Sequence, residues 1–566
     1  MRLTSDARIA AYRAHGWWGD LTIDDLTQRN RREVPDRPAL VDPPNRAALD
    51  GAAPRRLTWG EVGAEVDRLA AAFLGLGLAR DDIVCVQLPN AVDAVLTFLA
   101  CARLGLVCCP VVTQYRTHEL GYILGLVKPA AVVTVARCAG FDHARMMQDL
   151  TAGGTAKVLV FGGDTPAGAV DLTAAAAAAN PALAMAAHLD DPVEAGEVAT
   201  VCWTSGTEAR PKGVPRDHNH WIVNAKVIVA ASGLEDGEVM LNPFPLVNIG
   251  SIGGLVMPWL WRRCTLVLHH PFDLTVFLAQ IASERVNYTI APPAILTAIL
   301  KSPALRAAAD LSSVRAIGSG SAPLSAWMIE GFQSDYGIQI CNYFGSNEGA
   351  SLYSSPVETP DPADRAHYFP RFGADGVDWE SPAAQMIRTR LVDLADGRDI
   401  TGPGRPGELR IDGAMVFSGY FRSPALNEAA FDDRGYFRTG DLFEIAGDGS
   451  RFYRFVGRCK EIIIRGGMNI SPAEIDDLLA AHPDLREAAV VGVPDEALGE
   501  RVCLAACPAE GRNPELADIC AWLRAKDVAV FKLPERMVVL DALPRSAMNK
   551  VLRNDLRVQV LAALGA

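Results

Sequence analysis

The sequence predicts an α/β fold with a large N-terminal lobe and a small C-terminal lobe. Short β-branched segments alternate with longer Ala- and Leu-rich segments over most of the 566 residues, which is typical of helices layered on largely parallel sheets. From about residue 397 the pattern changes to short strands and Gly-rich turns, which indicates a β-rich subdomain. The last hundred residues read as a compact α+β unit.

The expected elements follow in chain order. Strands are expected at Asp82–Leu88, Val107–Val112, Lys157–Phe161 and Thr265–Leu268, with helices at Ala91–Leu104 and Ala174–Ala179. Residues 94–112 are mostly apolar, but Arg103 lies within them and Pro110 interrupts their end. A core helix followed by a strand is therefore favoured over a membrane span. The segment leading to Asp191 and Pro192 is expected to be a surface connection.

The C-terminal part divides again. Strands are expected at 407–413 and 435–441, then a helix at Pro472–Ala481 and a strand at Ala488–Val493. The predicted large lobe is 1–457, with mixed and parallel sheets and the β-rich subdomain. A hinge at 458–460 precedes a small, mobile α+β lobe at 461–566.

Composition excludes several classes of protein. The chain has 54 Lys and Arg against 67 Asp and Glu, a formal net charge of −13, which argues against a nucleic-acid partner. With 49% apolar and 21% charged residues, disorder is not expected. Twelve cysteines show no C-x-x-C spacing and read as reduced thiols. We expect a cytoplasmic protein without a membrane partner.

The most informative segment follows a buried-strand sequence at 201–203. It is a hydroxyl- and glycine-rich loop that ends at a lysine, and backbone N–H groups and hydroxyls of such a loop can surround phosphate oxygens. The spacing does not fit a Walker loop, and an ordinary surface turn is an equally good interpretation of the loop alone. The residues concerned are Thr204, Ser205, Gly206, Thr207 and Lys212.

Four later segments of the sequence favour the phosphate-binding interpretation of this loop over a surface turn. They are Asn342–Gly349, Tyr436–Leu442, Gly457–Glu461 with its continuation to Glu474, and Leu543–Val551. Taken in order with the loop, they resemble the phosphate, aromatic-Gly, Thr-Gly-Asp, hinge and C-terminal lysine blocks of the adenylate-forming superfamily. That superfamily includes acyl-CoA synthetases, peptide-synthetase adenylation domains and luciferases. The resemblance covers nearly the whole chain from about residue 35.

The resemblance implies an ATP-dependent acid:CoA ligase with an acyl-AMP intermediate. It implies that Lys550 bridges the acid and the α-phosphate, that Glu348 holds Mg²⁺, and that Asp441 accepts hydrogen bonds from ribose hydroxyls. Phe344 would lie beside adenine and Arg458 would reach ribose or phosphate oxygens. The implied nucleotide-binding residues are Thr204, Ser205, Gly206, Thr207, Lys212, Phe344, Gly345, Asn347, Asp441 and Arg458.

A second half-reaction is implied by the hinge block. Family members rotate the small lobe after the adenylate forms, so one site serves two reactions. Lys460 occupies the hinge position and is counted, with Lys550 and Glu348, among the catalytic residues. Gly466 and Gly467 would admit the pantetheine arm of coenzyme A; a plain hairpin turn is the alternative.

The sequence departs from the family pattern in three places, and all of them lie in the adenylation machinery. Glu208 and Ala209 stand where Thr-Gly is commoner, so a carboxylate would face the β- and γ-phosphates. Asn347 replaces a threonine, and Asn549 replaces the glycine before Lys550, where Asn is the least costly substitute if φ is positive. These departures raise the hypothesis of a ligase biased towards thioester formation from a supplied acyl-adenylate.

The acid is less well defined. Asn248 stands in a segment that often carries an aromatic residue and a histidine, and small residues suggest a roomy pocket. The overall pattern is similar to bacterial ligases for cyclohexanecarboxylate-type or medium-chain acids. We expect a bulky alicyclic or terpenoid acid in a secondary-metabolite pathway such as antibiotic biosynthesis. The residues proposed for the pocket are Asn248, Gly250, Gly253, Gly254, Gly318 and Gly320.

Other interpretations stay open. Asn248 would reach a ring hydroxyl if the acid were aromatic. The acceptor thiol would belong to a carrier protein rather than to CoA in a stand-alone adenylation enzyme, because both thiols share the pantetheine arm. A degenerate, non-catalytic binder of acyl-AMP is the remaining alternative. The oligomeric state is open, with a dimer as one alternative.

Overall fold

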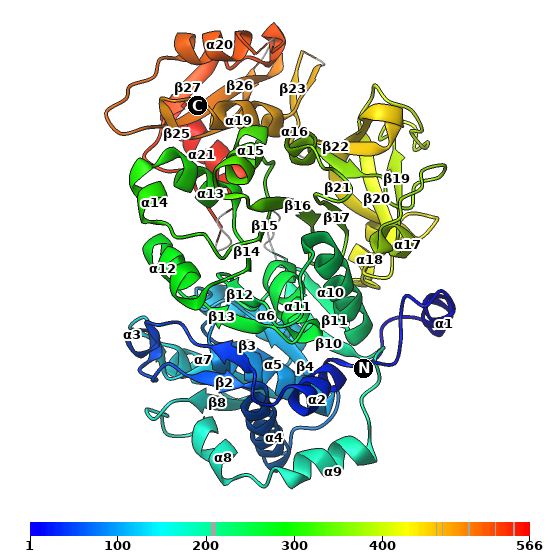
Figure 1. Cartoon of the computed structure of the whole chain (residues 1–566), viewed down its shortest axis with the longest axis vertical. Helices are drawn as coiled ribbons and strands as arrows, with labels where there is room; N and C mark the ends of the chain where they lie inside the picture. The colour runs from blue at the N-terminus through cyan, green and yellow to red at the C-terminus, as the bar shows by residue number, and fades with distance from the viewer. Residues whose placement is uncertain are drawn as a thin grey trace.

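The structure is a computed structural model and describes residues 1–204, 211–459, 461–466, 468–495, 498–526, 528–546 and 550–565. Figure 1 shows two large sheets with their helices in the blue to green part of the chain, a yellow β-rich subdomain beside them, and a small orange to red lobe at the C-terminal end. This architecture confirms the predicted α/β class with mixed, largely parallel sheets.

The first sheet has seven strands in the order β11-β10-β4-β3-β5-β8-β9. Their bounds are β3 Ile83–Gln87, β4 Val107–Pro110, β5 Ala131–Val135, β8 Lys157–Phe161, β9 Val170–Asp171, β10 Val198–Trp203 and β11 Gly213–Asp217. All neighbours are parallel except β11, which pairs antiparallel with β10. Strands β3, β5 and β10 are buried along their whole length, which explains their continuous apolar sequences.

The second sheet has eight strands in the order β17-β16-β15-β14-β12-β13-β1-β2. Their bounds are β1 Pro38–Val41, β2 Arg56–Thr58, β12 Val239–Asn242, β13 Thr265–Leu268, β14 Tyr288–Ile290, β15 Ala316–Gly320, β16 Gln339–Gly345 and β17 Ser351–Ser354. The edge strands β2 and β17 are antiparallel to their neighbours, and the six between them are parallel. The turn after β16 therefore leaves the carboxyl end of a parallel strand, where α/β proteins commonly bind ligands.

Helices cover these sheets. In the large lobe they are α1 Asp6–Ala14, α2 Ile23–Glu33, α3 Arg46–Asp50, α4 Trp59–Gly75, α5 Val92–Leu104, α6 Thr117–Val127, α7 His143–Thr151, α8 Leu172–Ala178, α9 Ala182–Asp190, α10 His218–Ser232, α11 Met257–Trp261, α12 Leu274–Glu284, α13 Pro293–Lys301, α14 Pro303–Ala308, α15 Ala326–Tyr336, α16 Pro362–His367, α17 Pro382–Met386 and α18 Pro424–Ala430. A π-helical turn, η1 Ile249–Val256, precedes α11.

Helix α5 confirms the core helix predicted for the apolar segment. Every one of its residues is buried, and β4 follows it as expected. Arg103 within the helix is fully buried and pairs with Asp24, at 2.8 Å, and with Asp67. A buried guanidinium is tolerated because both carboxylates neutralise it.

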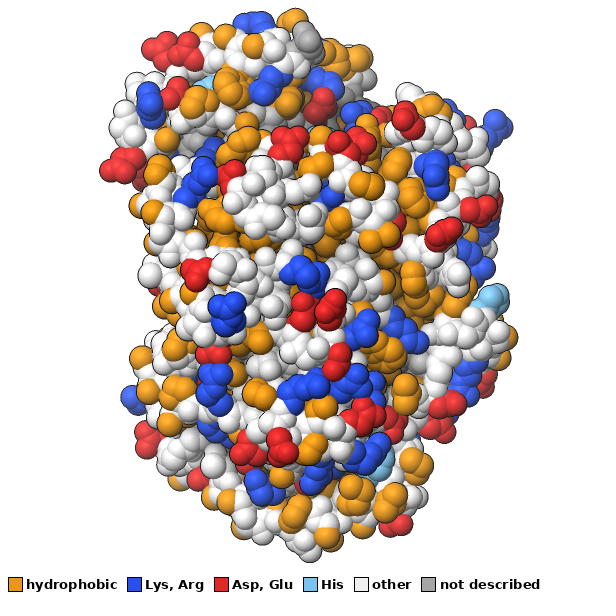
Figure 2. All heavy atoms as spheres, in the orientation of Figure 1, with side chains coloured by type: hydrophobic (Ala, Val, Ile, Leu, Met, Phe, Trp, Pro, Cys, Tyr) orange, Lys and Arg blue, Asp and Glu red, His pale blue; other side chains and the backbone are white. Residues whose placement is uncertain are grey.

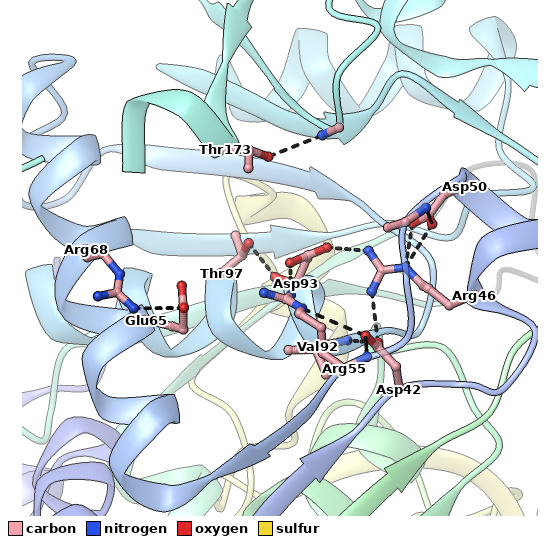
Figure 3. A network of polar contacts seen from close by, with 12 residues as sticks. Asp42, Arg46, Asp50, Arg55, Glu65, Arg68, Val92, Asp93, Thr97 and Thr173 are labelled. Carbon is pink, nitrogen blue, oxygen red and sulfur yellow. Dashed lines mark hydrogen bonds and ion pairs between the residues drawn. The ribbon is translucent and has the colours of Figure 1, made fainter. Parts of the chain in front are cut away.

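Arg46 forms a second buried ion network, which Figure 3 shows at close range. Its guanidinium lies 2.9 Å from Asp42 and 2.8 Å from Asp50, and it also pairs with Asp93. Arg55 pairs with Asp93 from the other side. Since Asp93 lies in the first turn of α5, the network fixes α3 and the end of β1 against that helix.

One expectation about the large lobe was incomplete. The segment before Asp191 lies at the surface as expected, but it contains a helix that was not expected, α9, which begins after Pro181 and packs against α4 and α5. Its Ala184 is fully buried. The Ala- and Leu-rich composition favours a helix, and Pro181 in front of it is compatible with a helix start.

Two further observations bear on the class of protein. No single helix in the described ranges is long and apolar enough to span a membrane, although the bent pair α8 and α9 passes the same test together. All twelve cysteines are free, and all except Cys459 are buried. Burial raises the pKa of the Cys202 thiol to about 12, so these thiols act as packing residues.

The β-rich subdomain is an antiparallel sheet in the order β18-β22-β21-β20-β19. Its strands are β18 Tyr368–Pro370, β19 Ile387–Val392, β20 Gly407–Gly413, β21 Phe437–Ala446 and β22 Phe452–Arg458. An N-terminal arm, residues 8–18, lies against its 413–418 loop. Trp18 Nε1 donates to Ala414 O at 2.9 Å, and Arg8 donates to Val416 O at 3.2 Å.

The small lobe is built on a sheet in the order β24-β23-β26-β25, with β27 paired parallel to β26. Its elements are β23 Ile463–Arg465, β24 Met468–Ile470, α19 Pro472–Ala480, β25 Leu485–Asp495, β26 Gly499–Pro508, α20 Leu516–Arg524, β27 Arg536–Val539 and α21 Arg553–Leu564. The expected helix and strand are confirmed as α19 and β25. The division at 457, 458–460 and 461 remains a prediction.

Candidate functional site

The structure brings four of the predicted site residues together from distant parts of the sequence. Asp441 on β21 and Arg458 on β22 are direct partners across the two strands, and Arg458 Nε lies 3.2 Å from Asp441 Oδ1. Glu348 comes from the turn between β16 and β17, and Lys550 from the end of the small lobe. Both are near enough for their charges to act on Asp441.

Asp441 is a buried carboxyl, with 5% of its surface exposed. Burial raises the pKa of Asp441 to about 6, because the ionised form loses its water. The cations of Arg458 and Lys550 oppose this rise in pKa, and the carboxylates of Glu461 and Glu348 add to it. Carboxyl groups whose pKa is raised in this way occur often at functional sites.

Lys550 is held by its neighbour Ser546. The Ser546 N–H donates to Lys550 O at 2.8 Å, and the Lys550 N–H donates to Ser546 Oγ at 3.2 Å. Burial is the main cause that lowers the pKa of the Lys550 ammonium, with Arg458 adding to it and Glu461 and Asp441 opposing it. The small lobe thus has the orientation that brings Lys550 to Asp441. Asn549 lies outside the described residues.

Glu348 is fixed by main-chain and side-chain contacts. It is 8% exposed, its Oε1 accepts a 2.9 Å hydrogen bond from the Tyr420 hydroxyl, and its carbonyl accepts one from Phe417 N–H at 2.8 Å. Gly349 beside it has φ +87°, and a Cβ there would lie 1.8 Å from Met415 O, so only glycine fits.

The acidic residues fit a magnesium ion that arrives with a nucleotide. Within the described ranges there is no group of three or more His, Cys, Asp or Glu side chains that would form a metal cage. Mg²⁺ usually binds one or two carboxylates together with substrate phosphates. Glu348 meets that requirement, since no donor in the described part of the chain bonds its Oε2.

The predicted phosphate loop connects β10 and β11 as a hairpin. Thr204 N–H donates to Lys212 O at 3.0 Å, and Lys212 N–H donates to Thr204 Oγ1 at 3.1 Å, so the two ends of the loop are tied. Lys212 Nζ lies 5.2 Å from the centre of the Tyr420 ring. The loop positions Ser205, Gly206, Thr207, Glu208 and Ala209 lie outside the described residues.

Asn347 has a different environment from the one expected of a phosphate-binding side chain. Its Nδ2 donates to Trp203 O at 2.9 Å, and its Oδ1 accepts from Ile249 N–H at 2.8 Å. The amide therefore joins the end of β10 to the start of η1. The main-chain carbonyl of Asn347 accepts a hydrogen bond from the buried Arg216 at 3.3 Å. Burial lowers the pKa of Arg216 to about 10.

The aromatic block packs into the β-rich subdomain. The Phe344 ring meets Phe443 edge-on with 5.1 Å between ring centres, and Phe369 lies 6.2 Å away. Phe344 stays half-buried, which leaves part of its surface available to an adenine ring. Gly345 is the last residue of β16 and leads into the turn that carries Glu348.

Four of the five glycines proposed for a roomy pocket have neighbours in the space that a side chain would take. A Cβ on Gly318 would lie 2.3 Å from the Tyr343 ring, and one on Gly320 would lie 2.0 Å from Tyr343 O. Similar contacts at 2.5 Å face Gly253 and Gly254. Near Gly250, Asn248 Oδ1 is the one atom of the described residues that a Cβ would approach, at 3.4 Å. Absent side chains at 253, 254, 318 and 320 therefore give no measure of pocket size.

Asn248 is the cap of η1. Its Oδ1 accepts a hydrogen bond from Ser251 N–H at 3.1 Å, which satisfies one of the free donors at the helix start. This contact accounts for an asparagine at this position without a substrate. A role of Asn248 in acid selection stays a prediction.

The hinge block is only partly described. Gly466, with φ +56°, follows β23 in the connection to β24, and its N–H donates to Leu498 O at 2.7 Å. A positive φ explains the glycine as a hairpin residue. Lys460 and Gly467 lie outside the described residues, so their proposed roles stay predictions.

The positive charge that anionic substrates need is local. Figure 2 shows acidic and basic side chains interspersed over the visible face. The net charge of −13 thus describes the whole surface, while Arg458, Lys550 and Lys212 supply cations at the site. Two further residues were not predicted for the site: Tyr420, whose hydroxyl bonds Glu348, and Glu461, whose charge acts on Asp441 and Lys550.

The chain belongs to the AMP-binding enzyme family. The family model of AMP-binding enzymes matches residues 27–421, and the model of the AMP-binding enzyme C-terminal domain matches residues 474–550. Together they cover Glu348 and Lys550, and Asp441 and Arg458 lie between the two matches.

Two relatives cover almost the whole chain. A 2-hydroxy-7-methoxy-5-methyl-1-naphthoate–CoA ligase from Streptomyces carzinostaticus is 32% identical over 98% of this chain and 95% of its own. A salicyl-AMP ligase/salicyl-S-ArCP synthetase from Mycobacterium tuberculosis is 28% identical over 99% of this chain and 94% of its own. The crystal structure of ATP-bound MatB from Rhodopseudomonas palustris has a TM-score of 0.78, at 27% identity, over 96% of this chain and all of that one.

Proposed function

We propose that the chain is an ATP-dependent acid:CoA ligase that forms an acyl-AMP and transfers the acyl group to coenzyme A with release of AMP. The observation that carries this proposal is the cluster of Lys550, Asp441, Arg458 and Glu348, which joins the two lobes. The family match and the relative named as a CoA ligase support it.

Adenylation requires positioning rather than a general base. A carboxylic acid is already ionised at neutral pH, so its oxygen attacks the α-phosphorus directly and pyrophosphate leaves. The Lys550 ammonium would neutralise charge between the carboxylate and the phosphoryl group. Asp441 would accept hydrogen bonds from the ribose hydroxyls, and Arg458 would reach ribose or phosphate oxygens.

Glu348 is the residue that would hold magnesium. A bound Mg²⁺ would supply charge neutralisation to the phosphate oxygens. Phe344 would pack beside adenine, and Lys212 would add positive charge at the loop. The roles of Thr204, Gly345 and Asn347 in nucleotide binding remain part of the proposal, although the Asn347 amide already joins Trp203 to Ile249.

Thioester formation would follow after the small lobe turns. The CoA thiol would lose its proton to solvent as its sulfur attacks the acyl carbonyl, and AMP would leave with the electrons of the C–O bond. Lys460 would act as the hinge, and Gly466 and Gly467 would line the approach of the pantetheine arm. Buried, free cysteines are compatible with a cytoplasmic enzyme.

For the acid, we propose a bulky ring-bearing molecule, an alicyclic or terpenoid acid of a secondary-metabolite pathway. Its support is the similarity to cyclohexanecarboxylate-type ligases and the fused-ring acid in the name of the Streptomyces relative. That same name favours an aromatic acid as the alternative. Asn248, Gly250, Gly318 and Gly320 remain the proposed pocket positions.

A second candidate is an enzyme that loads a carrier protein. The relative named as a salicyl-S-ArCP synthetase favours it. Mass spectrometry of products from an acid panel with Mg-ATP and either CoA or a pantetheinylated carrier protein separates the two. Thioester on CoA alone supports the ligase, and thioester on the carrier alone overturns the CoA assignment.

The proposed bias towards the second half-reaction has its own test. Turnover from acid and ATP is compared with turnover of synthetic acyl-AMP and CoA. Much faster turnover from acyl-AMP supports the bias, and equally fast turnover from both ends it. If neither route gives a product, the chain is a non-catalytic binder of acyl-AMP. A Lys550→Ala variant should lose turnover from ATP and retain turnover from acyl-AMP.

A further inference from the structure

Tyr420 stands between two parts of the nucleotide site that come from different sheets. It lies in the 413–421 segment after β20, which touches both the phosphate hairpin and the Glu348 turn. Phe417 N–H donates to Glu348 O, and Phe421 N–H donates to Gly213 O, each at 2.8 Å. The main chain on either side of Tyr420 is therefore tied to the two motifs.

The side chain of Tyr420 repeats this connection. Its hydroxyl donates to Glu348 Oε1 at 2.9 Å, and its ring lies 5.2 Å from Lys212 Nζ. A hydrogen bond to a carboxylate is stronger than one between neutral groups, and a cation over an aromatic face is attracted to it. One residue thus contacts both the cation of the phosphate hairpin and the carboxylate assigned to Mg²⁺.

The position of Tyr420 is itself tightly determined. Its N–H donates to Asn427 Oδ1 at 2.6 Å, and its carbonyl accepts from Asn427 Nδ2 at 3.2 Å. Gly419 before it has φ +133°, and a Cβ there would lie 2.9 Å from the Asn427 side chain. Tyr420 is 7% exposed and packs edge-on against Phe417. A side chain held in this way has little freedom to turn away.

We propose that Tyr420 is a positioning residue for adenylation, which holds the Glu348 carboxylate with its hydroxyl and the Lys212 ammonium with its ring. Mg²⁺ binding and phosphate binding are then linked through one side chain. The inference rests on the proposed role of Glu348. It predicts a defect confined to the step that uses Mg-ATP.

The test separates the two half-reactions in the full-length chain. For Tyr420→Phe, the Mg²⁺ concentration for half-maximal pyrophosphate release should rise by about tenfold or more, the range expected from losing a hydrogen bond to a charged group. Thioester formation from synthetic acyl-AMP and CoA should stay within about twofold of wild type. A parallel fall of both half-reactions, or an unchanged Mg²⁺ dependence, overturns the proposal.

A matched control is Tyr453→Phe. Tyr453 is also buried in the β-rich subdomain, and its hydroxyl bonds Thr389 Oγ1 at 3.1 Å. It should lose a comparable amount of thermal stability without any change in Mg²⁺ dependence. If Tyr453→Phe shifts the Mg²⁺ dependence as much as Tyr420→Phe does, the effect is one of general packing and the proposal fails.

A double-mutant cycle distinguishes this proposal from the role of Glu348. Glu348→Gln should raise the Mg²⁺ requirement, and Tyr420→Phe should add little in that background, because the hydroxyl acts through the carboxylate. An unchanged Mg²⁺ requirement in Glu348→Gln overturns both assignments. If Glu348→Gln raises the Mg²⁺ requirement and Tyr420→Phe does not, only the role of Tyr420 is overturned.

The ring is tested by Tyr420→Leu. This variant lacks both the hydroxyl and the aromatic face, so its KM for ATP should exceed that of Tyr420→Phe. Equal KM values for the two variants would remove Lys212 from the proposal.

Discussion

Nucleotide binding should weaken in acid because Asp441 must be ionised to accept hydrogen bonds from ribose. Burial raises the pKa of this carboxyl to about 6, so it is half-protonated near that pH before a nucleotide binds. If only the ionised form binds, the affinity falls by about tenfold, or about 1.4 kcal/mol, for each pH unit below 6.

Calorimetric titration with adenosine between about pH 5 and about pH 8 tests this expectation, because adenosine carries no phosphate that titrates there. The Asp441→Asn variant provides the control, since its amide keeps the shape and does not ionise in this range. Its affinity should be weak and independent of pH. A wild-type profile that is flat through pH 6, or an equal slope in the variant, would refute the assignment.

The same carboxyl affects stability with the opposite sign. Because the pKa of Asp441 is higher in the folded protein than its ordinary value of 3.8, the folded state keeps its proton over a range where the unfolded chain has lost it. The contribution of this group to the free energy of unfolding therefore falls as pH rises from about 4 to about 6, by up to about 3 kcal/mol. In urea denaturation, the free energy of unfolding of wild type should fall relative to that of Asp441→Asn as pH rises over this interval. A constant difference between the two free energies contradicts the raised pKa.

Three further substitutions test other contacts. Lys301→Met removes the 2.6 Å hydrogen bond from α13 to Ala480 O at the end of α19. Adenylation should slow by about fivefold, while turnover of acyl-AMP should stay unchanged. An equal loss in both assays argues against a contact specific to this lobe orientation. Asn347→Ala should lower the free energy of unfolding by about 2 kcal/mol, as two hydrogen bonds are lost, and unchanged urea denaturation would contradict the bridge. Asn248→Ala should cost about 1 kcal/mol in the same assay, with an unchanged acid profile; an altered profile at unchanged stability would place the side chain in the pocket.

Much of the fold could be predicted because burial leaves a direct pattern. Strand β8 and helix α5 are close to their expected bounds, since continuous apolar sequences of these lengths leave few alternatives. Helix α9 was missed because propensity alone is a weak guide where the residues are small and little buried. The cluster of Glu348, Asp441 and Lys550 was reached through block resemblance, as no local pattern says that residues this far apart meet.

The size of a pocket could not be predicted from the glycines, for a physical reason. A glycine in a sequence shows that a side chain is absent, but it does not show what fills the space. At Gly318 and Gly320 a neighbouring strand residue, Tyr343, occupies it. Tyr420 could not be predicted for the complementary reason, because its importance comes from lying between Lys212 and Glu348 in space.

The N-terminal arm has a consequence for how the protein is made. Trp18 bonds Ala414, a residue 396 positions later. At about 5–20 residues per second, a ribosome needs roughly 20–80 s to complete the intervening chain. During that time the arm can pack only against earlier parts of the lobe, where the Trp18 ring lies 5.1 Å from that of His220, and its hydrogen bond to Ala414 cannot form. The arm therefore takes its final position only after the 413–418 loop has been synthesised.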